Sequence, residues 1–296
     1  MQKHLICSLM WQKTIILSKV FDFKDRNLKE MIEILVNLSK LWHKEIQIDF
    51  SNIKQIRKGD LMALMAQLEK LSLRQKQIKF TGNISKNVRD LLSEKVVHFR
   101  TDVLNNAKIA SEVNPDIVEN VVNDLKVLGI SRNSIFGYTF YERIKALLTE
   151  IMGNAVEHGI RNKNINYWLT SEIDTKNKQI IFTFVDMGQG IAHSHKRAKT
   201  FLKITGLFSD NKIIIDSLEG KLPSSTQELN RGKGLPEIRK IIEKKIVSEF
   251  VLVTNRTLVQ YNNNQFSTTR ISNFKGTYYC WTINKNNFEK WKRTFQ

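Results

Sequence analysis

Glu150-Ile-Met-Gly-Asn154 lies near the middle of the chain and is followed by Asp186-Met-Gly188-Gln-Gly190 and, after a longer interval, by Gly232-Lys-Gly234-Leu235. The spacing of Glu150 and Asn154 puts a carboxylate and an amide on one face of a helix. The amide oxygen can ligate a hard cation such as Mg²⁺, and the carboxylate can orient or deprotonate an attacking hydroxyl. These residue types therefore predict a site for a magnesium-bound triphosphate.

The glycines of the second and third segments predict two different contacts with such a ligand. Glycine lets the backbone approach a ligand closely and adopt positive φ, which suits Gly188 and Gly190. Gly234 stands directly before a predicted helix, where free N–H groups and the positive end of the helix dipole favour phosphate. Each signal alone is common in turns, so the prediction depends on their order along the chain.

The predicted secondary structure places these segments at the ends of regular elements. A helical pattern runs from Tyr138 to His158, and an apolar strand over Gln179–Val185 ends at Asp186. Gly276-Thr277 is expected to open the last strand of the domain. The order of helix, glycine turn, second glycine pair and strand is typical of one group of nucleotide-binding domains.

Residues from about Phe136 to Ile283 resemble the GHKL superfamily, the ATP-binding domain of gyrases, heat-shock chaperones, sensor histidine kinases and mismatch-repair ATPases. The resemblance implies an α/β (α+β) sandwich of helices on a mixed β-sheet, with ATP between the helix layer and a mobile lid. It implies Glu150 as the catalytic carboxylate and Asn154 as the ligand of Mg²⁺. The further positions that it implies for cofactor binding are His158 after the helix, Asp186 at the adenine amino group, Gly188 and Gly190 beneath the base, Gly232, Gly234 and Leu235 at the phosphates, and Thr277 near the adenine.

The interval between Ile191 and Asn230 is predicted to form the lid. It is about forty residues long and contains the breakers Gly220 and Pro223, and so long a connection is uncommon in a compact domain unless it is functional or disordered. Closure of such a segment would exclude water and complete the site. The run Ile213-Ile-Ile215 indicates that part of the lid packs on the domain.

Basic residues in and beside the lid are the candidates for contacts with the β and γ phosphates. Lys196 and Arg197 belong to a charge run that is more typical of a solvated surface. Arg231 and Lys233 are the better candidates because they flank Gly232.

Residues 1–105 predict a separate, smaller α/β domain, and residues 106–296 the ATP-binding domain, with the boundary near Asn106. Helical patterns alternate with short strands, an order typical of parallel strands joined by right-handed crossovers. The expected elements are helices at Leu28–Leu41, Asp60–Leu71 and Ser85–His98, and strands at Glu45–Phe50 and Gln77–Phe80. A further helix is expected at Pro115–Leu128, closed by Gly129.

The first domain resembles a STAS domain, the module of anti-sigma-factor antagonists, on the segments Ile48-Asp-Phe-Ser51 and Ile56-Arg-Lys-Gly-Asp-Leu61. Where that family carries an Asp-Ser-Ser-Gly loop with a phosphoacceptor serine, this chain has Arg57-Lys58-Gly59-Asp60. No hydroxyl stands at that loop. The resemblance therefore implies a docking or scaffold role, and an unrelated appendage of helices and strands is the alternative.

Composition limits the classes of protein to consider. The 296 residues carry a formal net charge of +18 that is spread along the sequence, so nucleic acid is kept as a second partner class behind a protein partner or a homodimer. No apolar run reaches the ~18 residues of a membrane span, and the N-terminus lacks the apolar core of a signal peptide. Cys7 and Cys280 form no disulfide framework. A cytoplasmic protein is expected.

The residues leave the phosphate acceptor open. Glu150 could align water, as in an ATPase, or accept a proton from a partner's hydroxyl, as in a serine/threonine kinase of the anti-sigma type. A sensor histidine kinase is disfavoured because His98-Phe-Arg-Thr101 lacks the acidic neighbour expected after its histidine. Two further alternatives are a switch that reports ATP occupancy without turnover and a basic nucleic-acid-binding protein that uses the ATP fold.

Overall fold

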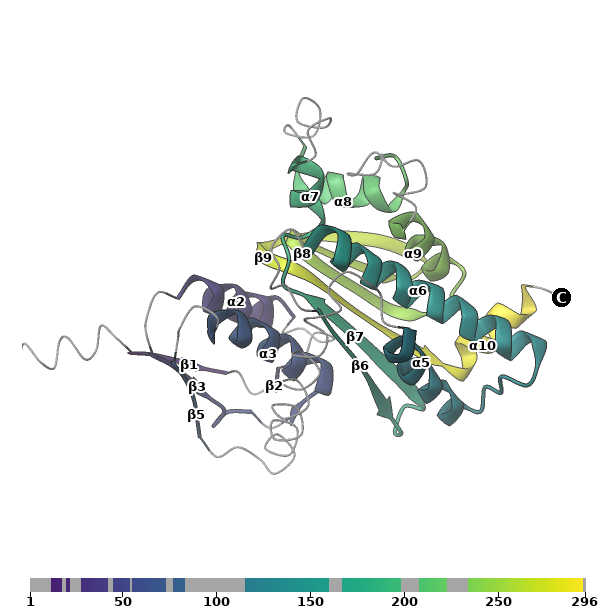
Figure 1. Cartoon of the computed structure of the whole chain (residues 1–296), viewed down its shortest axis with the longest axis horizontal. Helices are drawn as coiled ribbons and strands as arrows, with labels where there is room; N and C mark the ends of the chain where they lie inside the picture. The colour runs from purple at the N-terminus through teal and green to yellow at the C-terminus, as the bar shows by residue number, and fades with distance from the viewer. Residues whose placement is uncertain are drawn as a thin grey trace, which may run out of the picture. The chain divides into compact units, whose positions relative to one another are not determined.

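The computed structural model of the chain describes ten ranges of residues: 12–17, 20–21, 28–41, 45–53, 55–72, 77–82, 115–159, 167–197, 208–222 and 234–294. Contacts divide the chain into two compact units, Met1–Asn105 and Asn106–Gln296, whose helices and strands are labelled in Figure 1. None of the helices in the described ranges is long and apolar enough to cross a bilayer.

The first unit is built on a parallel sheet. Its three strands are, in spatial order, β1 (Gln12–Ile16), β3 (Glu45–Asp49) and β5 (Gln77–Thr81). Helices α2 (Leu28–Lys40) and α3 (Lys58–Ser72) follow strands in the chain, and β2 (Val20–Phe21) pairs with β4 (Gln55–Ile56). The predicted alternation of helices and parallel strands is confirmed for these residues, whereas β1 had not been predicted. The helix expected at Ser85–His98 lies outside the described residues.

Arg57, directly before α3, is paired with Asp60 in the first turn of that helix. The Arg57 guanidinium donates from Nε to the buried Asp60 carboxylate at 2.8 Å. An ion pair removed from water in this way fixes the start of α3. The predicted loop at Arg57–Asp60 is therefore, from Lys58 on, the first turn of α3.

The second unit is a layer of helices on an antiparallel sheet, so the α+β class with helices on a sheet is confirmed. The described strands, in spatial order, are β6 (Tyr167–Asp174), β7 (Gln179–Asp186), β9 (Gln265–Asn284) and β8 (Ser248–Asn262). All three pairings are antiparallel, so the mixed pairing expected for this sheet is absent from the described strands.

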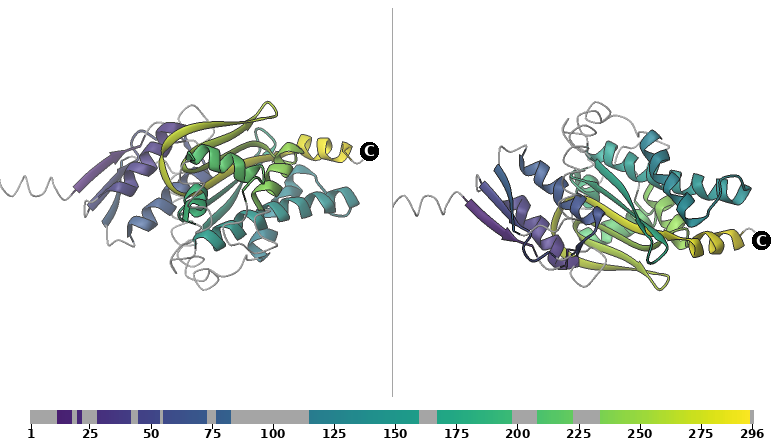
Figure 2. Two further views of the ribbon diagram at one scale, coloured as in Figure 1. Left: turned by 90° about the horizontal axis from the view of Figure 1, so that it is seen from above. Right: turned by 90° about the horizontal axis from the view of Figure 1, so that it is seen from below.

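Helices of this unit bury one face of the sheet, as Figure 1 and Figure 2 show from three directions. They are α5 (Pro115–Asn123), the 3₁₀ helix η1 (Asp124–Leu128), α6 (Ile135–Gly159), α7 (Ile191–Arg197), α8 (Asp210–Leu218), α9 (Gly234–Glu243) and α10 (Lys285–Arg293). Ile144, Leu148 and Ile151 of α6 recur at helical spacing and are fully buried. They share one core with Phe182 and Trp281 of the sheet, whose rings stack.

Several sequence predictions for this unit are confirmed. The helix expected from Tyr138 to His158 is α6, and the polar stretch at Asn262–Gln265 is the turn between β8 and β9, where Asn263 and Asn264 have φ of 51° and 63°. Positive φ at both residues is the backbone of a tight hairpin turn. Ile213 and Ile214 of the predicted lid are fully buried, which confirms that this part of it packs.

Two predicted boundaries were wrong. The last strand does not open at Gly276-Thr277, because β9 begins at Gln265 and runs through both residues as one arm of a long hairpin. The helix expected over Pro115–Leu128 changes to 3₁₀ geometry after Asn123 and ends at Gly129, which has φ of 71°. Tighter winding of a last turn before a left-handed glycine is a common helix ending.

Gly276 combines a positive φ with a close contact, so an added methyl group is expected to be costly there. Its φ is +128°, and a Cβ there would lie 2.1 Å from the Asp186 carbonyl oxygen. We expect Gly276→Ala to lower the free energy of unfolding by about 2 kcal/mol or more, measured by chemical denaturation. Gly153→Ala in α6 is the control, since a Cβ there meets none of the described residues within 4 Å. An equal effect of both substitutions would contradict the strain assigned to Gly276.

Candidate functional site

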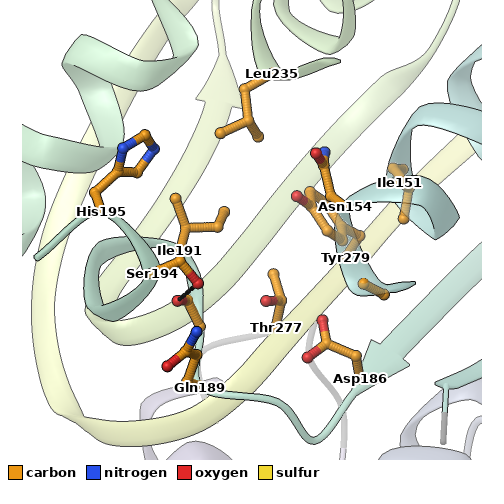
Figure 3. A pocket seen from close by; sticks show the side chains of 12 residues that line it. Ile151, Asn154, Asp186, Gln189, Ile191, Ser194, His195, Leu235, Thr277 and Tyr279 are labelled. Atoms are coloured by element: carbon orange, nitrogen blue, oxygen red, sulfur yellow. Dashed lines mark hydrogen bonds between the residues drawn. The ribbon is translucent and has the colours of Figure 1, made fainter. Parts of the chain in front are cut away.

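A pocket opens between the helix layer and one end of the sheet in the second unit. It holds about 450 Å³ of empty space, including the open solvent at its mouth. Figure 3 shows its lining side chains, which come from α6, the turn after β7, α7, the start of α9 and β9. The lining residues are Ile151, Asn154, Ala155, Asp186, Gln189, Gly190, Ile191, Ser194, His195, Leu235, Thr277 and Tyr279. A largely apolar wall with a few polar groups is typical of small-molecule sites.

Asp186 and Thr277 form one polar end of the pocket. They are directly opposite each other in the antiparallel pairing of β7 with β9, so both side chains lie on the same face of the sheet. Each residue is only 5% exposed. The Asp186 carboxylate accepts a hydrogen bond from the backbone N–H of Gly188 at 2.8 Å. The first glycine of the Asp-x-Gly-x-Gly turn thus holds the carboxylate in place.

Gly190 ends that turn in a conformation that favours glycine. Its φ is +79°, and a Cβ there would lie 2.6 Å from the side-chain amide of Asn255. The turn therefore passes so close to β8 that a larger residue would overlap it. The glycine was predicted from the sequence as a point of close backbone approach, and its neighbour Asn255 was not.

Glu150, Asn154 and Gly234 meet where α6 contacts the start of α9, beside the pocket that Asn154 lines. A Cβ on Gly234 would lie 2.7 Å from Oε2 of Glu150 and 3.2 Å from both terminal atoms of the Asn154 amide. The first turn of α9 therefore rests against the carboxylate and the amide of α6, and both groups face a helix N-terminus. Asn154 lines the pocket, whereas Glu150 stands beside the α9 N-terminus and is outside the set of lining residues.

The side-chain amide of Asn154 has unused hydrogen-bonding capacity among the described residues. Its Nδ2 atom is buried and has no hydrogen-bond partner among the described residues. Rotation of the amide by 180° would put the oxygen at that position. A buried polar atom without a partner costs free energy, so this position favours a ligand that offers a cation or a hydrogen-bonding group.

Tyr279 forms part of the floor. It lies two residues after Thr277 on β9 and therefore on the same face of the sheet. Burial, with a smaller contribution from the charge of Asp186, raises the pKa of the Tyr279 phenol well above its ordinary value. The phenol is therefore neutral at physiological pH and offers the pocket a hydroxyl group without adding a charge.

Helix α7 of the predicted lid lines one side of the pocket, and α8 contacts α7. Ser194 donates to the carbonyl oxygen of Gly190 at 3.0 Å, as the dashed line in Figure 3 shows. Nε2 of His195 lies 3.1 Å from the Ser217 hydroxyl, which joins α7 to α8. Lys196 had been predicted as a candidate phosphate contact, but its ammonium group pairs with the Asp210 carboxylate at 2.6 Å.

The structure brings together most of the described residues predicted for the site. Asn154, Asp186, Gly190, Leu235 and Thr277 line one pocket. Gly188 donates its backbone N–H to Asp186, and Gly234 packs against Asn154. Arg231, Gly232 and Lys233 lie outside the described residues, as do the side chains of His158 and Arg197.

Several lining residues were not predicted from the sequence, although helix or strand spacing could have indicated some of them. Ile151 is three residues before Asn154, and Ala155 is four residues after Ile151, so helical spacing could have indicated both. Tyr279 follows Thr277 at strand spacing. Gln189 and Ser194 carry no such signal, because their place in the wall depends on how the turn docks on β8.

Comparisons with known proteins leave the family open. No family model matches the chain, and no curated protein sequence matches it. Among solved structures, the chain is similar to the histidine kinase domain of the Erythrobacter litoralis EL346 blue-light activated histidine kinase, with 11% sequence identity over 90% of this chain and 99% of that one. The TM-score is 0.31. That score is too low to support a common architecture, so the function is inferred from the site itself.

Proposed function

We propose that the unit Asn106–Gln296 binds Mg-ATP in this pocket and acts as a signalling or regulatory protein of the GHKL type. The observation that carries the proposal is the convergence of three segments that are far apart in the sequence. Glu150 and Asn154 meet Gly234 beside the pocket that Asn154 lines, while Asp186 and Thr277 face each other within it. Packing alone gives no reason for these polar residues to converge.

The two polar groups of residues suit the two ends of ATP. A buried carboxylate accepts hydrogen bonds and therefore fits the amino group of adenine, with the Thr277 hydroxyl beside it. Apolar lining residues such as Ile151 and Ile191 provide contact area for the base. Beside Asn154, the N-terminus of α9 supplies backbone N–H groups and a positive dipole for phosphates.

The donor set at the α9 end fits magnesium. Asn154 can present an amide oxygen, which is a ligand type that Mg²⁺ accepts while it keeps several waters and phosphate oxygens. Bound Mg-ATP would supply the γ-phosphoryl group. Glu150, which stands beside this end, would orient the attacking hydroxyl and accept its proton. Positioning and charge neutralisation account for most of the catalysis in phosphoryl transfer.

The acceptor of the phosphoryl group is either water or a hydroxyl of a partner protein, since one carboxylate serves both reactions. The switch without turnover and a nucleic-acid-binding protein that uses the ATP fold are the alternatives. Glu150 favours chemistry over the switch, because a site that only senses occupancy needs no base. The first unit, with its paired Arg57 and Asp60, fits a docking module for the partner and has no acceptor serine at that loop.

Calorimetry of the full chain tests nucleotide binding directly. We expect one Mg-ATP per chain, and weaker binding of Mg-GTP, because guanine has an oxygen where Asp186 requires an amino group. No heat with Mg-ATP at high protein concentration would refute the proposal.

Incubation with γ-labelled ATP, alone and with candidate partner proteins, identifies the acceptor. Free phosphate indicates an ATPase, and a labelled partner indicates a kinase. If nucleotide binds and neither product forms, the protein is an occupancy switch.

A further inference from the structure

Strand β8 carries three buried polar side chains within four residues. Thr254, Asn255 and Thr257 are 0%, 1% and 0% exposed. The register of β8 with β9 shifts between Thr254 and Asn255 and again between Asn255 and Thr257, and Asn255 has φ of 49°. Such an irregularity re-aims side chains away from their regular positions on the sheet. Buried polar groups need partners, and here the partners belong to the loop and helices at the pocket.

Asn255 binds the segment that runs from the glycine turn into α7. Its Oδ1 accepts from the backbone N–H of Ala192 at 2.9 Å and from that of His193 at 3.4 Å. Its Nδ2 donates to the carbonyl oxygen of Gln189 at 2.8 Å. One side chain therefore holds both sides of the turn that ends at Gly190.

The two threonines extend this attachment. Oγ1 of Thr254 accepts from the N–H of Ile191 at 3.0 Å and donates to the carbonyl oxygen of Gly276 at 3.1 Å. The Thr257 hydroxyl donates to Asn211 of α8 at 2.7 Å. The first N–H groups of a helix have no partner within the helix, and in α7 those of Ile191, Ala192 and His193 are bound by β8.

This arrangement has a direct consequence for the pocket. Gly190 directly precedes α7 and has no side chain to cap it, so the cap comes from a strand about sixty residues later in the chain. Because those N–H groups donate to side chains of β8, they are not available to bind a ligand. The backbone that it fixes carries Gln189, Gly190 and Ile191, three consecutive residues of the pocket wall.

We propose that Asn255 is a positioning residue of the nucleotide pocket. Asn255 does not itself line the pocket. It binds the Gln189–His193 backbone to β8 and thereby keeps the wall in the shape that receives the base. The expected effect of Asn255 on nucleotide affinity rests on the proposed Mg-ATP site. Its effect on the turn rests on the structure alone.

The test combines amide hydrogen exchange without nucleotide and calorimetry with Mg-ATP. Asn255→Gly removes every side-chain bond and still accepts φ of 49°. We expect exchange of the Ala192 and His193 amides to accelerate tenfold or more, exchange in β7 to stay unchanged, and the Kd for Mg-ATP to rise at least tenfold, since a buried donor would lose its partner. Asn255→Asp keeps the acceptor for Ala192 and His193, so their exchange should be slower than in Asn255→Gly.

Asn263→Gly is the matched control, because Asn263 has a similar φ of 51° in the exposed turn of the same hairpin. It should change neither measurement. Unchanged exchange at Ala192 and His193 in Asn255→Gly would overturn the positioning role, whatever the protein binds. Faster exchange with an unchanged Kd would overturn the effect on the pocket. A wild-type chain without affinity for Mg-ATP refutes the proposed function separately, and the exchange result still decides whether Asn255 holds the turn.

Discussion

Asp186→Asn is expected to reduce the affinity for Mg-ATP by a factor of a hundred or more. The Asp186 carboxylate is almost fully buried, lines the pocket and accepts the Gly188 N–H at 2.8 Å. In the Asp186→Asn variant the amide oxygen can accept from Gly188 only if the NH₂ group points toward the ligand. That NH₂ group and the adenine amino group are both hydrogen-bond donors, so they cannot bond to each other. Loss of a charge-assisted bond together with a new unpaired donor costs about 3 kcal/mol or more, and 1.4 kcal/mol corresponds to a factor of ten in Kd.

Asp174→Asn is the control for this prediction. Asp174 lies at the other end of the β6–β7 pair and holds a turn through the Asn177 side chain at 2.7 Å. Calorimetry should find the wild-type Kd in this variant. The midpoint of thermal unfolding should be compared for both variants, because Asp186 also holds the Gly188 turn. Equal affinity for Mg-ATP in Asp186→Asn and the wild type would refute the assignment of the base-binding end.

Local periodicity explains the part of the site that could be predicted from the sequence. Glu150 and Asn154 lie on one side of α6 because they are four residues apart, and Asp186 lies at the end of a strand because an apolar run ends there. The positive φ expected of the glycine turn is found at Gly190, whereas the close approach to a ligand stays a prediction. These features depend on neighbours within a few residues.

The remainder depends on pairings between distant segments. Thr277 faces Asp186 only because β9 begins at Gln265 and pairs with β7 in one register, and the sequence had placed the start of that strand eleven residues too late. Asn255 contacts the turn because the register of β8 with β9 shifts on both sides of it, and no local sequence pattern indicates that shift. Lys196 was a reasonable phosphate contact until the fold placed Asp210 beside it. A side chain's partner is decided by such long-range pairings.

Glu150→Ala is expected to abolish turnover of ATP while it leaves binding nearly unchanged. Glu150 stands against the first turn of α9, where a Cβ on Gly234 would lie 2.7 Å from its Oε2 atom, but it does not line the pocket. Its removal therefore costs little contact with a bound nucleotide. It does remove the group that would accept the proton from the attacking hydroxyl, and general base catalysis is worth about 10² to 10⁴ in rate.

Single-turnover release of labelled phosphate, or labelling of the partner, measures the chemical step, and calorimetry measures the Kd. Glu142→Ala is the matched control, because Glu142 is a partly exposed carboxylate on the same helix that pairs with Lys145. That variant should keep both values. If Glu150→Ala lost affinity and rate by the same factor, Glu150 would act in binding or in the packing of α9, because a base that works only in the transition state lowers the rate without weakening the ground-state complex.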